Sequence, residues 1–118
     1  MTRRRARARP RASPFDSILE ERYSAHLAGL KAAGEIREVW YHRIGVRLPG
    51  GYYYPDFLVE NNDGTLDFHE TKREGKTKDN RLRIGWAKVR AGAEILPIFG
   101  WVYVTHSTRS GWQLRRVE

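Results

Sequence analysis

The chain has 118 residues, of which 40% are hydrophobic and 31% are charged, and its formal net charge is +8. This length suits one domain with a single core, and no apolar run approaches the roughly 20 residues of a membrane-spanning helix. The chain contains no cysteine, which excludes disulfides and thiolate metal sites and is compatible with a cytoplasmic location.

Positive charge is concentrated in two segments. Residues 1–11 contain six arginines and no acid, and without them the remaining 16 basic and 14 acidic residues leave a charge of only +2. Residues 72–90 hold eight Lys or Arg against two acids. We expect residues 1–12 to form a disordered arginine-rich arm and residues 13–118 a single domain. The arm is either a solubilising extension or a contact for phosphate backbones; the second cluster favours nucleic acid.

The first predicted element is a helix over residues 13–33. Ser13 would cap it with Pro14 in its first turn, and Gly34 is a natural residue at which to end it. Glu20 borders the apolar stripe of this helix and Glu21 lies nearly opposite the stripe, so Glu20 can lean over the edge of the core. The stripe consists of Leu19, Tyr23, Leu27 and Leu30.

Five strands and a second helix are predicted after the first helix. Turn signals at 49–51 (Pro-Gly-Gly) and 61–64 (Asn-Asn-Asp-Gly) join the first three strands in antiparallel succession. The second helix covers 79–94, with an apolar face and a basic face. The predicted fold is α/β, with one mixed central sheet flanked by helices. The strands are expected at 38–48, 52–60, 65–73, 95–105 and 112–117.

Two acidic residues continue the apolar faces of neighbouring strands. Side chains two residues apart share a face of a strand, which places Asp56 and Glu70 where a charge is costly unless it is paired or binds a metal. Carboxylates suit Mg²⁺, which can polarise a phosphodiester and activate water. We therefore predict that both acids meet at one ion. Lys72 would orient or help deprotonate the attacking water, and Glu20 would supply a third acid.

The remaining polar and aromatic residues carry weaker signals. His69 should face away from Glu70, and His26 and His42 have no partner at metal-ligand spacing. The tyrosines at 52–54 alternate faces, so at least one can line the site. Four basic residues abut the acidic site and are therefore candidates for phosphate contact. They are Arg73, Lys76, Lys78 and Arg81.

This arrangement resembles the PD-(D/E)xK nuclease superfamily, here as Pro55-Asp56 and Glu70-Thr71-Lys72. Residues 15–100 are similar in layout to small phage-encoded members and to phage endonuclease I-type Holliday junction resolvases. The resemblance implies a restriction-endonuclease-like αβββαβ core and Mg²⁺-dependent DNA cleavage that leaves a 5′-phosphate, with Mn²⁺ as an alternative ion. It also implies branched DNA as a substrate, often a homodimer and, for a phage protein, the cytoplasm of a bacterial host.

The resemblance also assigns roles to individual residues. Relatives commonly place Gly after the catalytic lysine, where this chain has Arg73, which can reach a phosphate. The matched residues are Asp56 and Glu70 as metal ligands, the Thr71 backbone carbonyl as a further ligand, Lys72 as the catalytic lysine and Glu20 as the first-helix acid.

Two other functions are compatible with the sequence. The first is a nucleic-acid-binding module that keeps this fold without cleaving, favoured if the acids fail to converge or if Arg73 occupies the metal position. The second is a small basic structural protein in which Glu70 and Lys72 form a surface pair. Convergence of Asp56, Glu70 and Lys72 at one point would exclude the second.

Overall fold

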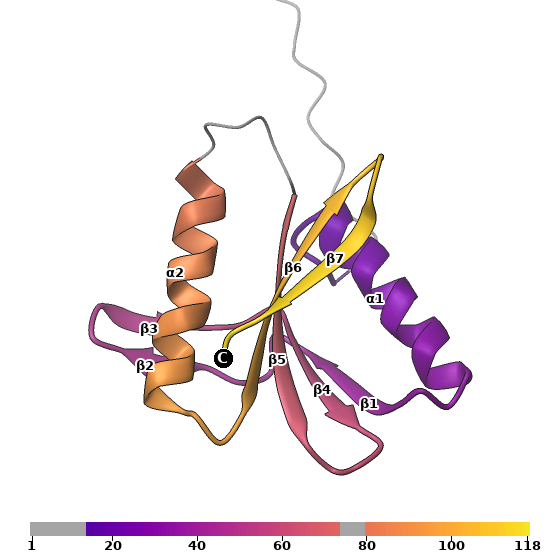
Figure 1. Ribbon diagram of the computed structural model, residues 1–118, viewed down its shortest axis with the longest axis horizontal. Helices are drawn as coiled ribbons and strands as arrows, with labels where there is room; N and C mark the ends of the chain where they lie inside the picture. The colour runs from indigo at the N-terminus through magenta and orange to yellow at the C-terminus, as the bar shows by residue number, and fades with distance from the viewer. Residues whose placement is uncertain (1–13, 74–79) are drawn as a thin grey trace, which may run out of the picture.

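A computed structural model describes residues 14–73 and 80–118, and within the second helix it describes side chains from residue 83 onward (Figure 1). The arginine-rich arm predicted at residues 1–12 lies outside this range. Among the described residues, no helix is both long enough and apolar enough to cross a membrane. The elements in chain order are α1 (Ile18–Ala32), β1 (Ile36–Tyr41), β2 (Val46–Leu48), β3 (Gly51–Tyr53), β4 (Phe57–Asn61), β5 (Leu66–Arg73), α2 (Asn80–Ile95), β6 (Gly100–Ser107) and β7 (Gly111–Arg116).

Five of these strands form one mixed sheet in the order β1-β4-β5-β6-β7. The β5–β6 pair is parallel and the other three pairs are antiparallel. Because a parallel pair needs a crossover, α2 connects β5 to β6. This confirms the predicted α/β class and the mixed sheet.

The two helices cover opposite faces of the sheet (Figure 1). On the α1 face, Tyr23 and Leu27 pack with residues of β4 and β6. On the α2 face, Val89 packs with Phe68 of β5 and Trp101 of β6. Both helical apolar faces were predicted from their spacing and are confirmed by the burial of these side chains.

The strands predicted at 38–48 and 52–60 are each broken into two. β1 pairs with β4 in the main sheet, whereas β2 and β3 form a separate two-stranded sheet. His42 breaks the first strand, because its φ of 48° lies in the left-handed region. Pro55 breaks the second, because proline has no N–H to donate to a ladder. The hairpin therefore bends out of the sheet just before Asp56.

Two helix boundaries also differ from the prediction. Ser17, rather than Ser13, caps α1: its Oγ accepts a hydrogen bond from the Glu20 N–H at 3.1 Å. Ile95 belongs to α2 rather than to the following strand, which begins only at Gly100. The predicted end of α1 is confirmed, because Gly34 has a φ of 77° that a side chain would disfavour.

A buried histidine lies on the α1 face of β5. His69 is 6% exposed, and its Nδ1 lies 2.7 Å from the Tyr23 hydroxyl. Burial lowers the pKa of His69 from 6.5 to about 4, so the ring is neutral at neutral pH and Nδ1 can accept a hydrogen bond from the Tyr23 hydroxyl. Its place away from Glu70 agrees with the strand alternation.

His69 should make stability depend on pH. Between pH 6.5 and about 4 the unfolded chain binds a proton on His69 that the folded chain excludes, so this residue's contribution to stability falls as pH falls. We expect the free energy of unfolding of the wild type to lose about 3 kcal/mol relative to His69→Asn across this window. Urea unfolding at several pH values measures the difference. His26→Asn, at a partly exposed histidine of α1, is the matched control; equal slopes for both variants would contradict the account.

Candidate functional site

Asp56 is a buried carboxylate at the point where β4 begins, and it is 6% exposed. Its Oδ2 accepts two hydrogen bonds of 2.8 Å, one from the Thr71 N–H and one from the Thr71 hydroxyl. Its Oδ1 lies 3.3 Å from Nε2 of His42. Three polar groups from two other segments thus hold this side chain in place.

Glu70 is a second buried carboxylate, on β5, and it is 7% exposed. Its Oε1 accepts hydrogen bonds from the Tyr53 hydroxyl at 3.0 Å and from the Asp56 N–H at 3.3 Å. Burial and then the charge of Asp56 raise the pKa of Glu70 to about 8, although Tyr53 and Lys72 act in the opposite direction. The site therefore places two acids where a second negative charge is costly.

The two acids meet because they close the same end of the β4–β5 ladder. Backbone pairing ends at Phe57 opposite His69. Beyond that pair, the Asp56 N–H donates to Glu70 and the Thr71 N–H donates to Asp56. The two carboxylates thus accept hydrogen bonds from two backbone N–H groups that have no partner in the β4–β5 ladder.

Lys72 follows Glu70 on the same face of β5 and is partly buried. Its positive charge acts to lower the pKa of Glu70, against the larger effects of burial and of Asp56. Helix α2 comes close at this point, because Gly85 has no side chain: a Cβ there would lie 3.1 Å from Cγ of Lys72 and 2.8 Å from the Tyr103 hydroxyl. Since Glu70 is buried, the pair is not a solvated surface ion pair.

Glu20 reaches the same region from α1. Its Oε1 accepts a hydrogen bond from the Tyr41 hydroxyl, and the same hydroxyl accepts one from the Asp16 N–H at 3.0 Å. Burial raises the pKa of Glu20, the bond from Tyr41 partly offsets this, and the charge of Asp56 raises it further. The charge of Asp56 thus acts on Glu20, and the role of Glu20 as a third acid stays a prediction.

Asp16 and His42 belong to the site and were missed by sequence reasoning. The statement that His42 lacks a partner at metal-ligand spacing is wrong, because its ring lies between Asp56 at 3.3 Å and Asp16 at 3.7 Å. The carboxylates of Asp16 and Glu20 and the ring of His42 offer ligand atoms within 4.8 Å of one another. Asp16 is exposed, and exposed acids often gather without an ion, so we assign none here.

The chemistry of the buried acids fits a hard divalent cation. Both hydrogen bonds to Glu70 described above fall on Oε1, so neither uses Oε2, and the contact of His42 with Asp56 Oδ1 is long at 3.3 Å. Carboxylate oxygens are the ligands that Mg²⁺ prefers, and a cation would relieve the repulsion that raises the pKa of Glu70. Asp56 and Glu70 would hold it. Thr71 lies beside them, with its N–H and hydroxyl turned to Asp56.

The residues predicted to contact DNA are only partly described. Arg73 ends β5 and is exposed. Lys76 and Lys78 lie outside the described residues, as does the side chain of Arg81 in the first turn of α2. Further along α2, Arg83, Lys88 and Arg90 are exposed.

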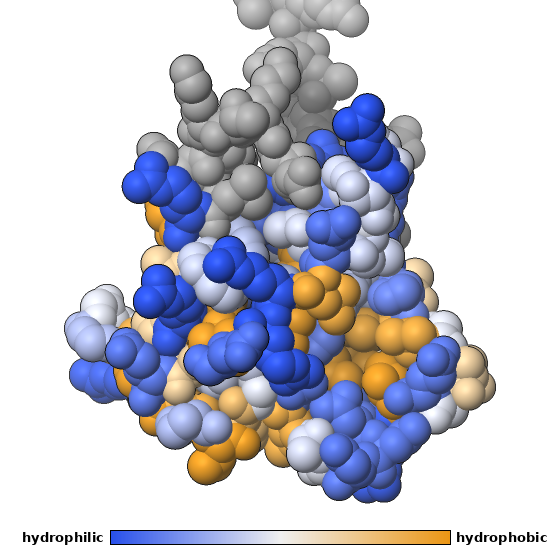
Figure 2. Space-filling model, in the orientation of Figure 1, coloured by the Kyte–Doolittle hydropathy of each residue, from blue (hydrophilic) through white to orange (hydrophobic). Residues whose placement is uncertain are grey.

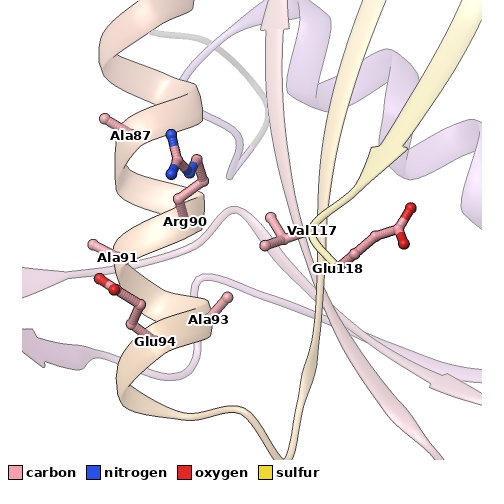
Figure 3. A pocket seen from close by; sticks show the side chains of 7 residues that line it. All are labelled: Ala87, Arg90, Ala91, Ala93, Glu94, Val117 and Glu118. Atoms are coloured by element: carbon pink, nitrogen blue, oxygen red, sulfur yellow. The ribbon is translucent and has the colours of Figure 1, made fainter.

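A pocket of about 460 Å³ lies elsewhere, between α2 and the end of the chain (Figure 3). None of the predicted site residues lines it. Three alanines of α2 line one side of the pocket with small side chains, and Val117 lines the other side. Its charged lining residues are Arg90, Glu94 and Glu118.

Comparison with known proteins does not assign the chain to a family. No protein-family model matches the chain, and searches of curated proteins and of solved structures find no significant match. The site is therefore interpreted from its own residues.

The raised pKa of Glu70 makes a second prediction about stability. Between pH 4.5 and about 8 the folded chain keeps a proton on Glu70 that the unfolded chain releases, so this contribution to stability is lost as pH rises. Glu70→Gln cannot ionise, and its amide oxygen can still accept from Tyr53. In EDTA, we expect the variant to gain stability over the wild type as pH rises through this window, measured by urea unfolding. Glu94→Gln, at an exposed residue of α2, is the matched control; a flat difference for Glu70→Gln would contradict the shifted pKa.

Proposed function

We propose that the chain is a Mg²⁺-dependent DNA endonuclease of the PD-(D/E)xK type. The observation that carries the proposal is the meeting of Asp56 and Glu70. These acids are 14 residues apart in the sequence, and both are buried at one end of the β4–β5 ladder, where the Asp56 N–H donates a hydrogen bond to Glu70. Lys72 lies on the same face of β5 as Glu70. Such a pair of oxygen ligands beside a lysine suits phosphodiester hydrolysis.

The arrangement of the strands supports the same proposal. A helix precedes the antiparallel strands β1, β4 and β5, and α2 then crosses to the parallel strand β6. This order is compatible with a restriction-endonuclease-like αβββαβ core, in which the β2–β3 hairpin is an excursion between the first two strands. The acids would lie at the end of the central strands, between the two helices.

Each residue of the site has a role in the proposed reaction. A bound Mg²⁺ would polarise the scissile phosphate and lower the pKa of the attacking water. Asp56 and Glu70 would hold the ion, with the Thr71 carbonyl as a further ligand, while the Tyr53 hydroxyl orients Glu70. Lys72 would orient the water or offset charge on the phosphate, and Glu20 would supply a third acid.

Basic side chains would hold the DNA backbone near these acids. Arg73 is the last residue of β5, and the exposed cations of α2 form a hydrophilic surface on that side of the molecule (Figure 2). Lys76, Lys78 and Arg81 would extend it. Such contacts add affinity without reading sequence.

A non-catalytic nucleic-acid-binding module is the second candidate. It is favoured by the hydrogen bonds that Asp56 accepts from Thr71, because they give this acid a structural role that needs no ion. Metal binding and turnover separate the two candidates.

We expect the wild type to cleave DNA with Mg²⁺ or Mn²⁺ and not in EDTA. Supercoiled plasmid, linear duplex and a four-way junction should be compared, and a preference for the junction would identify a resolvase. Glu70→Gln and Lys72→Ala should lose roughly a hundredfold or more in rate, because one removes a ligand charge and the other the cation beside it. Both should remain folded.

Glu94→Gln and Lys31→Ala are matched controls, because both residues are exposed and lie in the last turns of α2 and α1, away from the acids. They should cleave at the wild-type rate. Normal cleavage by Glu70→Gln would refute the assigned roles, and metal-independent binding without any cleavage would establish the binding module instead.

The arginine-rich arm should contribute to DNA affinity through counterion release. Deleting residues 1–11 removes six arginines. For every phosphate that the arm neutralises in the wild type, the deletion should flatten the slope of log affinity against log salt by about 0.9. Fluorescence anisotropy on a labelled duplex at several salt concentrations gives the slope. An unchanged slope would mean that the arm does not bind the phosphate backbone.

A further inference from the structure

The β2–β3 hairpin presents two tyrosines on one outward face. Burial alternates along this segment: Tyr53 is buried at 6% exposure, whereas Tyr52 and Tyr54 are exposed at 64% and 52%. The two outward rings lie 6.3 Å apart between their centroids, at 34° to each other. Large exposed rings side by side are unusual on a surface that has no partner.

Two residues contact the exposed rings: Arg47 in β2, and Gly45 just before β2. Arg47 pairs with Tyr52 across the hairpin, and its guanidinium carbon lies 5.5 Å from the centre of that ring. The ring of Tyr54 lies against Gly45, where a Cβ would come within 2.7 Å of it. The outward face is therefore an ordered aromatic surface.

The charge of the hairpin fits an anionic partner. From residue 39 to residue 55 the chain contains Arg43 and Arg47 and no acid, and both arginines are exposed. Aromatic rings flanked by cations are the elements with which proteins bind single-stranded nucleic acid: bases stack on the rings and phosphates contact the cations.

The hairpin is also joined directly to the proposed active site. Tyr53, between the two exposed rings, donates its hydroxyl hydrogen bond to Glu70. Tyr54 is followed by Pro55 and then by Asp56. DNA bound to the outer face of the hairpin would therefore lie next to the acids of the proposed active site.

We propose that Tyr52 and Tyr54 form a stacking surface for an unpaired base of the substrate, with Arg43 and Arg47 at the adjoining phosphates. The inference rests on the proposed function, which makes DNA the partner. A base inside a duplex has both faces stacked already, whereas a base at a junction, a gap or a strand end offers a free face. The surface therefore selects DNA with unpaired bases.

Binding of two probes in EDTA tests the surface without cleavage. The probes are a fluorescein-labelled oligothymidylate and a labelled duplex whose two ends are closed by non-nucleotide linkers, so that it offers no unpaired base. The double variant Tyr52→Leu/Tyr54→Leu should lose about fivefold or more in affinity for the oligothymidylate, because each stacked base contributes that much. It should lose about twofold or less for the closed duplex. Tyr52→Phe/Tyr54→Phe keeps the rings and should bind like the wild type.

A second variant tests the geometry while keeping both rings. Gly45→Ala would place a methyl group against the Tyr54 ring and force it to move, so it should also weaken oligothymidylate binding. Ile98→Ala, at an exposed residue beyond α2, is the control and should change neither affinity. Melting curves show that each variant is folded.

Three results would overturn the inference. The first is equal oligothymidylate binding by the Leu double variant and the wild type. The second is an equal loss in the Phe double variant, which would assign the effect to the hydroxyls. The third is a change in sedimentation of the Leu variant without DNA, which would make the surface a contact between copies of this chain. Cleavage by the wild type with no effect of the tyrosines defeats this inference alone; a tyrosine effect without cleavage defeats only the proposed nuclease.

Discussion

The site depends on a reciprocal pair of hydrogen bonds at one end of the β4–β5 ladder. The N–H of Asp56 donates to Glu70, and the N–H of Thr71 donates back to Asp56. A buried backbone donor without a partner costs roughly 1–3 kcal/mol, so the main chain itself fixes where both acids lie. Tyr53, His42 and Lys72 then approach a position that is already set.

Strand β5 separates two kinds of buried polar chemistry on its two faces. On the α1 face, burial keeps His69 neutral against Tyr23. On the α2 face, burial and Asp56 disfavour the charge of Glu70. The contribution of His69 to stability grows as pH rises, whereas that of Glu70 grows as pH falls. Only at Glu70 would a bound cation offset the cost of the buried charge. The structural and the chemical functions of the strand are thus separable by substitution.

Sequence periodicity predicted much of this arrangement, and its errors arise from contacts distant in sequence. Alternation placed Glu70 and Lys72 on one face and His69 on the other. Local signals could not choose between two equivalent helix starts, because Ser13 and Ser17 are each followed three residues later by an acid. The Tyr41 hydroxyl, which contacts both Asp16 and Glu20, favours the second start.

The role of His42 was hidden for a similar reason. In a hairpin with its turn at 49–51, the antiparallel register places residue 42 opposite Asp56 or a close neighbour of it. The predicted pairing of the two strands therefore already indicated that His42 and Asp56 lie close together. Spacing along the chain alone did not reveal it. The left-handed backbone of His42 and the proline before Asp56 then bend the hairpin, which no periodicity describes.

The most direct test of the central claim is a crystal structure with Mn²⁺, with diffraction data collected at the manganese absorption edge. The account predicts an anomalous peak in contact with both Asp56 and Glu70, absent from Glu70→Gln crystals treated in the same way. No peak at these acids, or one confined to Asp16, Glu20 and His42, would contradict the claim that the buried pair is a metal site.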